Sequence, residues 1–509
     1  MEEHPVSQFF SGACVLVTGA TGFVGKALVE KLLRCCPGLA AVYLLVRPKR
    51  GVDVAARHAR LLQHHVFDRV RRECPQALGK VCSVRGDVAL PGLWLDEPDR
   101  RELCARVTVV FHAAATVKFD ESLRVAANLN TAGTQRVLEL CRGMDKLQAF
   151  VHVSTAFSNA DRAEVGERVY PPPADPRGVA SCCEALPEAA LDQAAAALRG
   201  AHPNTYTATK AMAEWLVARH SGGVPAAIVR PSIVTAAWRE PAPGWLDNPG
   251  GITGVVAEMA RGTVRVLLGD VRLVVDLVPV DVVVNALLAV AWRTATSRPS
   301  EVRVYNCTSG SLRPVTWGAL SGLIAEHARA LPSARCCWYP GFRYTTSRAL
   351  FALLELLLHF LPAFVVDLVR RAAGSRPVML GLARRFHKST RNGSYFTLRE
   401  WKFHGDNLRA LAAALPSPDA AEGAFFFATD VSRIDWDQYV RSYVLGIRRH
   451  ILGEPDDSLP EARARLRRLR WLDRAVRALA AAAALRVVHV TCLRRDAPIR
   501  RLLARLGPA

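Results

Sequence analysis

The chain has 509 residues, half of them hydrophobic, and a formal net charge of +21. This length exceeds one ordinary domain, and the hydrophobic content excludes a wholly disordered chain, so two or three folded units are expected. The charge suits polyanionic ligands or an anionic membrane face. Because the basic residues are not interleaved with aromatic ones and no zinc-finger spacing occurs, we expect neither a nucleic acid partner nor a metal site.

The cysteines indicate a reducing compartment. Thirteen are present, and six of them form three adjacent pairs, which make a poor disulfide framework. No C-x-x-C motif occurs, and the polar, charged N-terminus does not resemble a secretory signal peptide. We therefore expect reduced, mostly buried thiols in a protein that faces the cytosol or an organelle of similar redox poise.

The first predicted strand, 15–18, leads into three glycines spaced three residues apart. Gly19 can adopt a φ that other residues rarely take, Gly22 lets the backbone approach a pyrophosphate, and Gly25 lets the next helix pack close to the strand. The N-terminus of that helix offers free N–H groups to a phosphate. A tight turn without a ligand is the alternative, but the strand–turn–helix order predicts a dinucleotide site. Its expected residues are Thr18, Gly19, Thr21, Gly22, Phe23, Val24 and Gly25.

The second predicted strand, 41–46, ends in a basic loop that contains Arg47 and Lys49. An NAD site usually carries an acidic residue here, which binds a ribose hydroxyl. Cations replace that acid in this chain, and they favour the 2′-phosphate of NADPH. A solvated basic loop is the alternative.

Further strands are predicted at 81–88, 107–111 and 150–155, with helical segments between them. This alternation predicts an α/β fold with a Rossmann-like, doubly wound parallel sheet, whose ligands bind at the carboxyl ends of the strands. Asp87 follows the third strand, where it could bond the adenine amine or cap a helix. After the fourth strand come His112, Ala113 and Ala114, and small residues there let a flat cofactor lie across the strand.

Tyr206 and Lys210 are four positions apart, so they lie on one face of a predicted helix. A nearby ammonium lowers the pKa of a phenol, and the phenol can pass a proton to a carbonyl oxygen that receives hydride. An ordinary amphipathic helix is the alternative. Together with Thr155 at a strand end and the glycine turn, the pair predicts a Thr-Tyr-Lys catalytic set.

These motifs resemble those of the extended short-chain dehydrogenases/reductases, and more narrowly those of the animal fatty acyl-CoA reductases, with the peroxisomal vertebrate members in particular. The resemblance extends from about residue 9 to about residue 472. Besides 18–25 and 206–210, it includes the stretches 152–157, 170–173, 229–234, 243–248 and 276–285. Phe157 departs from the pattern, since the family often has Tyr there.

The resemblance implies roles for individual residues. Thr155 is expected to hydrogen-bond the substrate carbonyl, with Ser154 as the alternative. Tyr206 is expected to be the proton donor, and Lys210 to orient Tyr206 and the nicotinamide ribose. Pro231 and Ser232, which follow another strand, are expected to border the nicotinamide.

The resemblance also implies an activity. It is the NADPH-dependent reduction of a long-chain fatty acyl-CoA through an aldehyde to the primary alcohol, with release of CoA, for wax or ether lipid precursors. Two alternatives are another extended reductase, such as a hydroxysteroid or nucleotide-sugar dehydrogenase, and a membrane-bound cofactor-binding protein without catalysis. A homo-oligomer is compatible with the sequence.

We expect three parts: a reductase domain at 10–315, a mainly helical domain at 316–455, and a basic, Ala/Arg-rich, membrane-associating tail at 456–509. Within the second part, 350–369 is apolar and long enough to span a bilayer. Its three ionisable residues, Glu355, His359 and Asp367, are costly in lipid, as is Pro362. We therefore expect a helix pair that lines the acyl site or dips into one leaflet, rather than a span.

The tail has thirteen arginines against three acidic residues from Glu461 onward. Alanines and interior arginines make a spanning anchor unfavourable, and a basic amphipathic helix on an anionic membrane is the physical alternative. The family resemblance implies the peroxisomal membrane, with a cytosolic catalytic domain, or else the endoplasmic reticulum.

Overall fold

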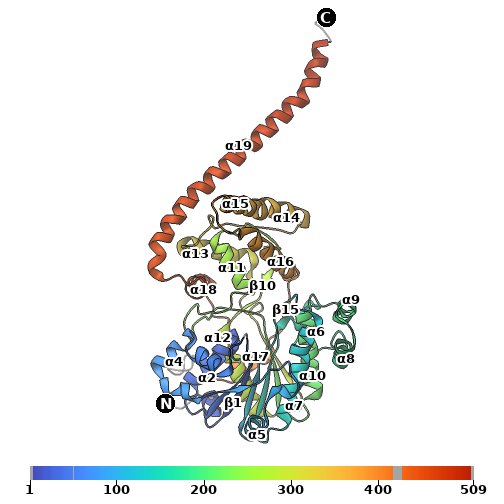
Figure 1. The fold of residues 1–509 in the computed structure, drawn as a ribbon, viewed down its shortest axis with the longest axis vertical. Helices are drawn as coiled ribbons and strands as arrows, with labels where there is room; N and C mark the ends of the chain where they lie inside the picture. Colours follow the sequence, from blue (N-terminus) through green and yellow to red (C-terminus); the bar gives the residue numbers. More distant parts are fainter. Residues whose placement is uncertain (1–3, 50, 417–426, 506–509) are drawn as a thin grey trace.

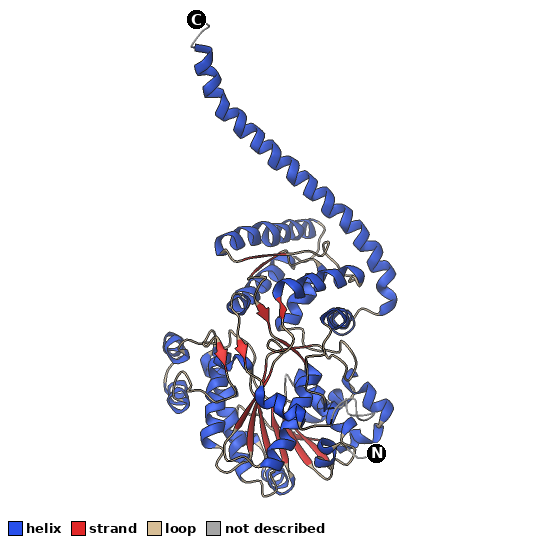
Figure 2. Ribbon diagram, turned by 180° about the vertical axis from the view of Figure 1, so that it is seen from behind, coloured by secondary structure: helices blue, strands red, loops and turns tan. Residues whose placement is uncertain are grey.

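The structure is a computed structural model that describes residues 4–49, 51–416 and 427–505. Its centre is a seven-stranded sheet with the strand order β12-β7-β5-β4-β1-β2-β3, in which every neighbouring pair is parallel (Figures 1 and 2). This confirms the predicted doubly wound α/β fold. The strands are β1 Cys14–Thr18, β2 Ala41–Val46, β3 Val81–Arg85, β4 Val109–His112, β5 Ala149–Val153, β7 Ala226–Pro231 and β12 Arg303–Cys307.

Two helical layers cover the sheet, because its apolar side chains alternate between the two faces. Val15 and Val17 belong to one core cluster with α2 (Phe23–Cys35) and α12 (Val280–Ser297), whereas Leu16 belongs to a second cluster with α7 (Gly133–Arg142). The α10 helix (Thr205–His220) packs against α7 on this second face. Other helices beside the sheet are α1 Pro5–Phe9, α3 Val54–Leu62, α4 Asp68–Glu73, α5 Glu97–Arg106, α6 Leu123–Ala126, α8 Pro176–Ala185 and α9 Glu188–Arg199.

A further group of elements, which we call the second layer, lies beyond the sheet and its covering helices, at the top of the body in Figure 1. It consists of helices and of the short parallel pair β9 and β14. Its elements are α11 Gly251–Arg261, β9 Val266–Leu268, α13 Trp317–Ala330, β14 Arg343–Thr345, α14 Arg348–Glu355, α15 Leu361–Ala372 and α16 Met379–Thr397. This layer contains most of the region predicted to be helical.

The chain then returns to the reductase region. β15 (Lys402–Phe403) pairs with β6 (Glu164–Val165), and α17 (Asp406–Ala413) packs on α12 and β12. The Tyr439 hydroxyl of α18 (Trp436–Gly446) lies 2.7 Å from Thr235 Oγ1. Contacts therefore cross the expected boundary at residue 315, and the three-part division stays a prediction. The remaining short strands are β8 Ile233–Thr235, β10 Val274–Val275, β11 Leu277–Pro279 and β13 Val315–Thr316.

The apolar segment forms one helical run rather than a pair of helices. α14 continues through a π-helical turn at 356–360 into α15. Within the described residues, 348–372 is the one helix long and apolar enough to cross a membrane, with a mean hydropathy of 2.2 in its most apolar window. Glu355, His359 and Asp367 are all buried against the protein.

The last helix, α19 (Leu459–Arg505), extends away from the body (Figures 1 and 2). Trp471, Leu479 and Leu485 are exposed along it. The side chains at 487, 488 and 490–505, and residues 506–509, lie outside the described part, so the expected membrane contact of the tail is not tested there. All the described cysteines are free thiols.

Candidate active site

The glycine turn between β1 and α2 has the predicted geometry. Gly19 has a φ of +74°, and a Cβ atom there would meet the backbone of Ala113 and Ala114 at 2.7 Å. A Cβ on Gly25 would collide with the backbone of Gly19, so this glycine allows the close packing of helix and strand. Gly22 precedes the first residue of α2 without a side-chain cap. The N–H groups at this helix end are therefore available to a dinucleotide phosphate, and the cradle fits such a cofactor.

The side chain of His112, the last residue of β4, joins β1 to α7. Its Nδ1 atom lies 2.8 Å from Thr18 Oγ1 and its Nε2 atom 3.0 Å from Thr134 Oγ1. Burial, together with the charge of Lys210, lowers the pKa of His112 to about 3. Because both ring nitrogens are engaged within the protein, only the backbone of His112 is left to contact a cofactor.

A cluster of cations follows β2, where the sequence predicted the phosphate-binding residues. Arg47 Nη1 lies 3.3 Å from Asp87 Oδ2. Arg57 of α3, which sequence reasoning missed, donates to the carbonyl oxygen of Arg47 and, at 3.3 Å, to Thr21 Oγ1. Burial and the neighbouring Arg47 lower the pKa of Arg57. Lys49 pairs through its backbone with Val52. The signal for Arg57 in the sequence is its place in a basic segment between the second and third predicted strands.

Tyr206 and Lys210 lie on α10, where the sequence predicted them. Tyr206 hydrogen-bonds Thr155, but burial is the larger effect and raises the pKa of Tyr206 to about 12. Lys210 Nζ lies 2.7 Å from the carbonyl oxygen of Val153 and 3.1 Å from His152 Nε2. The predicted lowering of the Tyr206 pKa by Lys210 is therefore wrong here, because desolvation of the phenolate dominates and the ammonium is held against β5. Burial lowers the pKa of Lys210 to about 7, opposed by the charge of Glu214.

Glu214 continues the four-residue spacing of Tyr206 and Lys210, and sequence reasoning missed it. Its carboxylate forms an ion pair with Arg230 of β7, with 2.6 Å between Oε2 and Nη2. It also accepts hydrogen bonds from the hydroxyls of Ser154 and Ser158. The Ser154 hydroxyl is thus committed to this buried network, whereas Thr155 lines the cavity described next.

An apolar cavity of about 540 Å³ lies between the sheet and the second layer. Thr155 and Tyr206 line it, together with residues of three helices. The apolar lining residues of α11, α13 and α16 include Ile252, Val256, Met259, Leu320, Ile324 and Phe396. No residue of 348–372 lines this cavity, so the expected contact of this segment with an acyl site is not seen here. α16, which packs against that segment, takes that place instead.

Phe157, in the turn that follows β5, contacts the C-terminal region. Its ring lies 5.3–5.4 Å, centroid to centroid, from those of Phe396, Trp401 and Phe403, at nearly right angles. All three lie within 316–455, the part of the chain predicted to be mainly helical. They pack against the residues that follow β5, because β15 returns the chain to that place.

Pro231 and Ser232 stand at the end of β7, and their expected place beside a nicotinamide stays a prediction. Pro231 is the last residue of that strand, and the backbone N–H of Ser232 donates to the carbonyl oxygen of Cys307 at 3.1 Å. Both lie at the carboxyl edge of the sheet, which the glycine turn shares.

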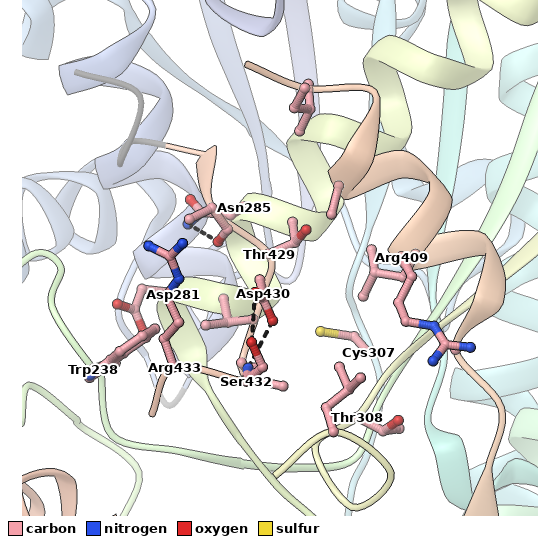
Figure 3. Close-up of a pocket in the computed structure, with 18 of the residues that line it drawn as sticks. Trp238, Asp281, Asn285, Cys307, Thr308, Arg409, Thr429, Asp430, Ser432 and Arg433 are labelled. Atoms are coloured by element: carbon pink, nitrogen blue, oxygen red, sulfur yellow. Dashed lines mark hydrogen bonds between the residues drawn. The ribbon is translucent and has the colours of Figure 1, made fainter. Parts of the chain in front are cut away.

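A larger cavity of about 810 Å³ lies elsewhere, between α12, the end of β12 and α17 (Figure 3). Asp281, Asn285, Cys307 and Arg409 are among its lining residues. The Asp281 carboxylate accepts backbone N–H bonds from Trp238 and the two residues after it, so it serves the loop rather than the cavity. None of the predicted catalytic residues lines this cavity.

The sheet order and the glycine turn define an extended short-chain dehydrogenase/reductase fold that binds a nicotinamide cofactor. Two solved reductase domains share the fold. The terminal R domain of the myxalamid PKS-NRPS pathway is 20% identical, with a TM-score of 0.55 and coverage of 87% of this chain and 92% of that one. The R domain of a nonribosomal peptide synthetase from Mycobacterium tuberculosis is 19% identical, with a TM-score of 0.55 and coverage of 86% and 92%.

Two family profiles, both described as "Male sterility protein", match residues 17–287 and 358–454. Fatty acyl-CoA reductase 2 of Bos taurus is 37% identical over 465 residues, which cover 91% of this chain and 90% of that protein. Fatty acyl-CoA reductase 1 of Xenopus laevis is 38% identical and that of Homo sapiens 37%, with the same coverage. The chain belongs to the fatty acyl-CoA reductase family.

Proposed function

We propose that this chain reduces long-chain fatty acyl-CoA with NADPH to the primary alcohol, releasing CoA. The observation that carries the proposal is the apolar cavity that contains both Thr155 and Tyr206. Such a cavity suits an acyl chain whose carbonyl carbon lies at these two hydroxyls. The curated relatives are named for the same substrate class.

In the proposed mechanism, Tyr206 donates the proton and Thr155 hydrogen-bonds the carbonyl oxygen. A raised pKa keeps the Tyr206 phenol protonated at neutral pH, as an acid requires. NADPH, when bound, supplies the hydride. Lys210 holds the nicotinamide ribose and Tyr206 in place, which requires its Nζ atom to turn from the Val153 carbonyl. We assign the carbonyl contact to Thr155 rather than Ser154, because the Ser154 hydroxyl serves Glu214.

For the cofactor, we propose NADPH rather than NADH. Arg47 and Arg57 stand where the 2′-phosphate would lie, and two guanidinium groups suit a phosphate. In this arrangement Asp87 lies beside the adenosine end of NADPH, and Lys49 adds positive charge to the loop after β2. Pro231, Ser232, Ala113 and Ala114 border the rest of the cofactor.

The alcohol requires two reductions, and we propose that both occur at this site. The carbonyl carbon of the acyl thioester accepts one hydride, and the C–S bond then breaks to give the aldehyde and CoA, which leaves as the thiol with one proton. The aldehyde accepts a second hydride and a second proton to give the alcohol, so two molecules of NADPH are consumed. A hydroxysteroid or nucleotide-sugar dehydrogenase would not need the aromatic contact between Phe157 and the C-terminal residues. A binding protein without catalysis would not need the Thr155–Tyr206 hydrogen bond.

We further propose that the protein acts at a membrane, with the peroxisome preferred over the endoplasmic reticulum. One long apolar helix among the described residues supports membrane association. The organelle rests on the family resemblance. A fluorescent fusion of the full chain, imaged with markers for both organelles, would test this proposal. A diffuse cytosolic signal would contradict it.

The activity is tested by incubating the purified chain with acyl-CoAs of graded length and with NADPH or NADH, followed by identification of the products. Alcohol is expected with NADPH, and no reduction of any acyl-CoA would refute the proposal. Tyr206→Phe should lower kcat by roughly 100- to 10,000-fold while NADPH still binds, because the proton donor is lost. Tyr43→Phe is the matched control, since its hydroxyl bonds only Glu102, away from the cavity.

A further inference from the structure

We propose that the helical run 348–372 docks into one leaflet of a lipid bilayer, lying in its plane. We call its outward side chains the apolar face: Leu350, Leu353, Leu356, Leu357, Leu358, Leu361, Phe364, Val365, Val366, Leu368 and Val369. Each is at least 40% exposed. They are eleven of the twenty-two large apolar side chains exposed in the described part of the chain. Soluble proteins rarely leave so many together uncovered.

The inward side of the same run explains why it does not span a membrane. The buried residues Phe351, Glu355, His359, Ala363 and Asp367 recur every fourth position, which places them on one side of the helix. These include all three ionisable residues that made a membrane span costly. The sequence alone could not show that these charges are turned away from the apolar face.

The inward polar groups are bonded to the protein body. Glu355 accepts a hydrogen bond from His387 Nδ1 of α16 at 2.8 Å, and His359 Nε2 accepts one from the backbone N–H of Arg265 at 2.9 Å. Asp367 accepts backbone N–H bonds from Val378 and the two residues after it at 2.8–2.9 Å. Crossing a bilayer would break these bonds and expose the charges to lipid. The helix is therefore fixed to the body with its apolar face outward.

The placement of the run favours a membrane as its partner. α14 and α15 form the outermost part of the second layer, and α19 extends past them on the same side (Figure 1). Exposed arginines flank the apolar face: Arg348 at its start, and Arg371 and Arg376 at its end. Apolar side chains bordered by cations match the acyl region and anionic headgroups of a leaflet. At 1.5 Å per residue, the 25 residues lie along about 37 Å of the surface.

The docking has a consequence for the substrate, which rests on the proposed function. α15 packs on α16, and α16 lines the acyl cavity with Ser389, Gly393 and Phe396. A docked leaflet would therefore lie one helix away from the cavity. Long-chain acyl-CoA partitions into membranes, so docking would place the substrate beside its site.

Photo-crosslinking of the full chain tests the docking directly. p-Benzoylphenylalanine replaces Phe364 in one preparation and Val125 in the other, and each is bound to vesicles of phosphatidylcholine and phosphatidylserine and then irradiated. Val125 is the matched control, because it is 40% exposed on α6, beside the sheet. We expect lipid adducts at position 364 in roughly tenfold excess over position 125.

Two outcomes would overturn the docking. Crosslinks between two chains at position 364 would assign the apolar face to self-association. Vesicle-bound protein without lipid adducts there would assign membrane binding to the tail alone. Circular dichroism and bound NADPH confirm that both preparations are folded.

A second measurement tests substrate delivery. Phe364→Glu should lower the rate with vesicle-borne palmitoyl-CoA roughly fivefold and leave the rate with water-soluble octanoyl-CoA within twofold, whereas Val125→Glu should change neither. Equal losses with both substrates would contradict delivery from the leaflet. If the unchanged chain reduces neither substrate, the proposed function fails, and the crosslinking result still decides the docking.

Discussion

Glu214 and Arg230 form a fully buried ion pair beneath the proposed catalytic residues, with 2.6 Å between Oε2 and Nη2. Arg230 also donates to the carbonyl oxygens of Gly166 and Arg168 at 2.9–3.0 Å. The pair therefore links α10, β7 and the loop that follows β6. Since Tyr206 and Lys210 precede Glu214 on the same helix, the pair also fixes the rotation of that helix toward the cavity.

Glu214→Gln should lower the free energy of unfolding by about 3–5 kcal/mol, because it leaves the Arg230 guanidinium buried without its counter-charge. Urea denaturation measures this change. Glu188→Gln is the control, since its ion pair with Arg124 is half exposed and its loss should cost less than about 1 kcal/mol. Equal effects of the two substitutions would contradict a structural role for the buried pair.

The two hydroxyls after β5 should respond differently to substitution. Thr155→Val should lower kcat roughly 100- to 1000-fold with little change in stability, because a hydrogen bond to the developing negative charge is lost. Ser154→Ala should lower kcat less than tenfold and stability by about 1–3 kcal/mol, since Glu214 loses a donor. Steady-state kinetics and thermal unfolding of both variants decide between them. The reverse pattern would show that Ser154, and not Thr155, hydrogen-bonds the substrate carbonyl.

The buried Lys210 should make stability depend on pH. Its pKa is about 7 in the folded chain, against an ordinary value of 10.5. Between these values the unfolded chain holds a proton that the folded chain has released, so stability should rise with pH, by up to about 1.4 kcal/mol per unit. Below about pH 7 both the folded and the unfolded chain carry this proton. The stability that Lys210 contributes at high pH is then fully lost and no longer changes with pH. Lys210→Met should remove this rise, which denaturation at several pH values measures; an unchanged profile would contradict the lowered pKa.

Arg57 should contribute to the choice of NADPH. Arg57→Ala should raise the KM for NADPH roughly tenfold or more and change that for NADH less than twofold, because only NADPH carries the 2′-phosphate. Kinetics with both cofactors give the ratio directly. Arg101→Ala, on the exposed side of α5, removes an equal charge away from the site and should change neither value. Equal losses with both cofactors would show that Arg57 acts on the turn through Thr21.

Much of the reductase half could be predicted from local patterns. The strands around Val15, Val42 and Val109 are runs of apolar residues between turn signals, and they pair in the parallel register that the α/β alternation implies. Gly19 and Gly25 were predictable because their roles follow from backbone sterics. The helical segment expected between the second and third strands is divided, since a turn at 65–67 lies between α3 and α4.

The fold class, the family resemblance and the places of Thr155, Tyr206 and Lys210 along the chain follow from local sequence patterns, because they depend on spacing along one strand or helix. The packing of distant segments was needed to show which hydroxyl faces the cavity, that Arg57 joins Arg47, and that Phe157 contacts Trp401. The same packing buries Glu355, His359 and Asp367 and leaves an apolar face exposed. These features depend on contacts between residues far apart in the chain. There burial outweighs local sequence: the pKa of the Tyr206 phenol is raised, although Lys210 lies on the same helix, because burial disfavours the phenolate.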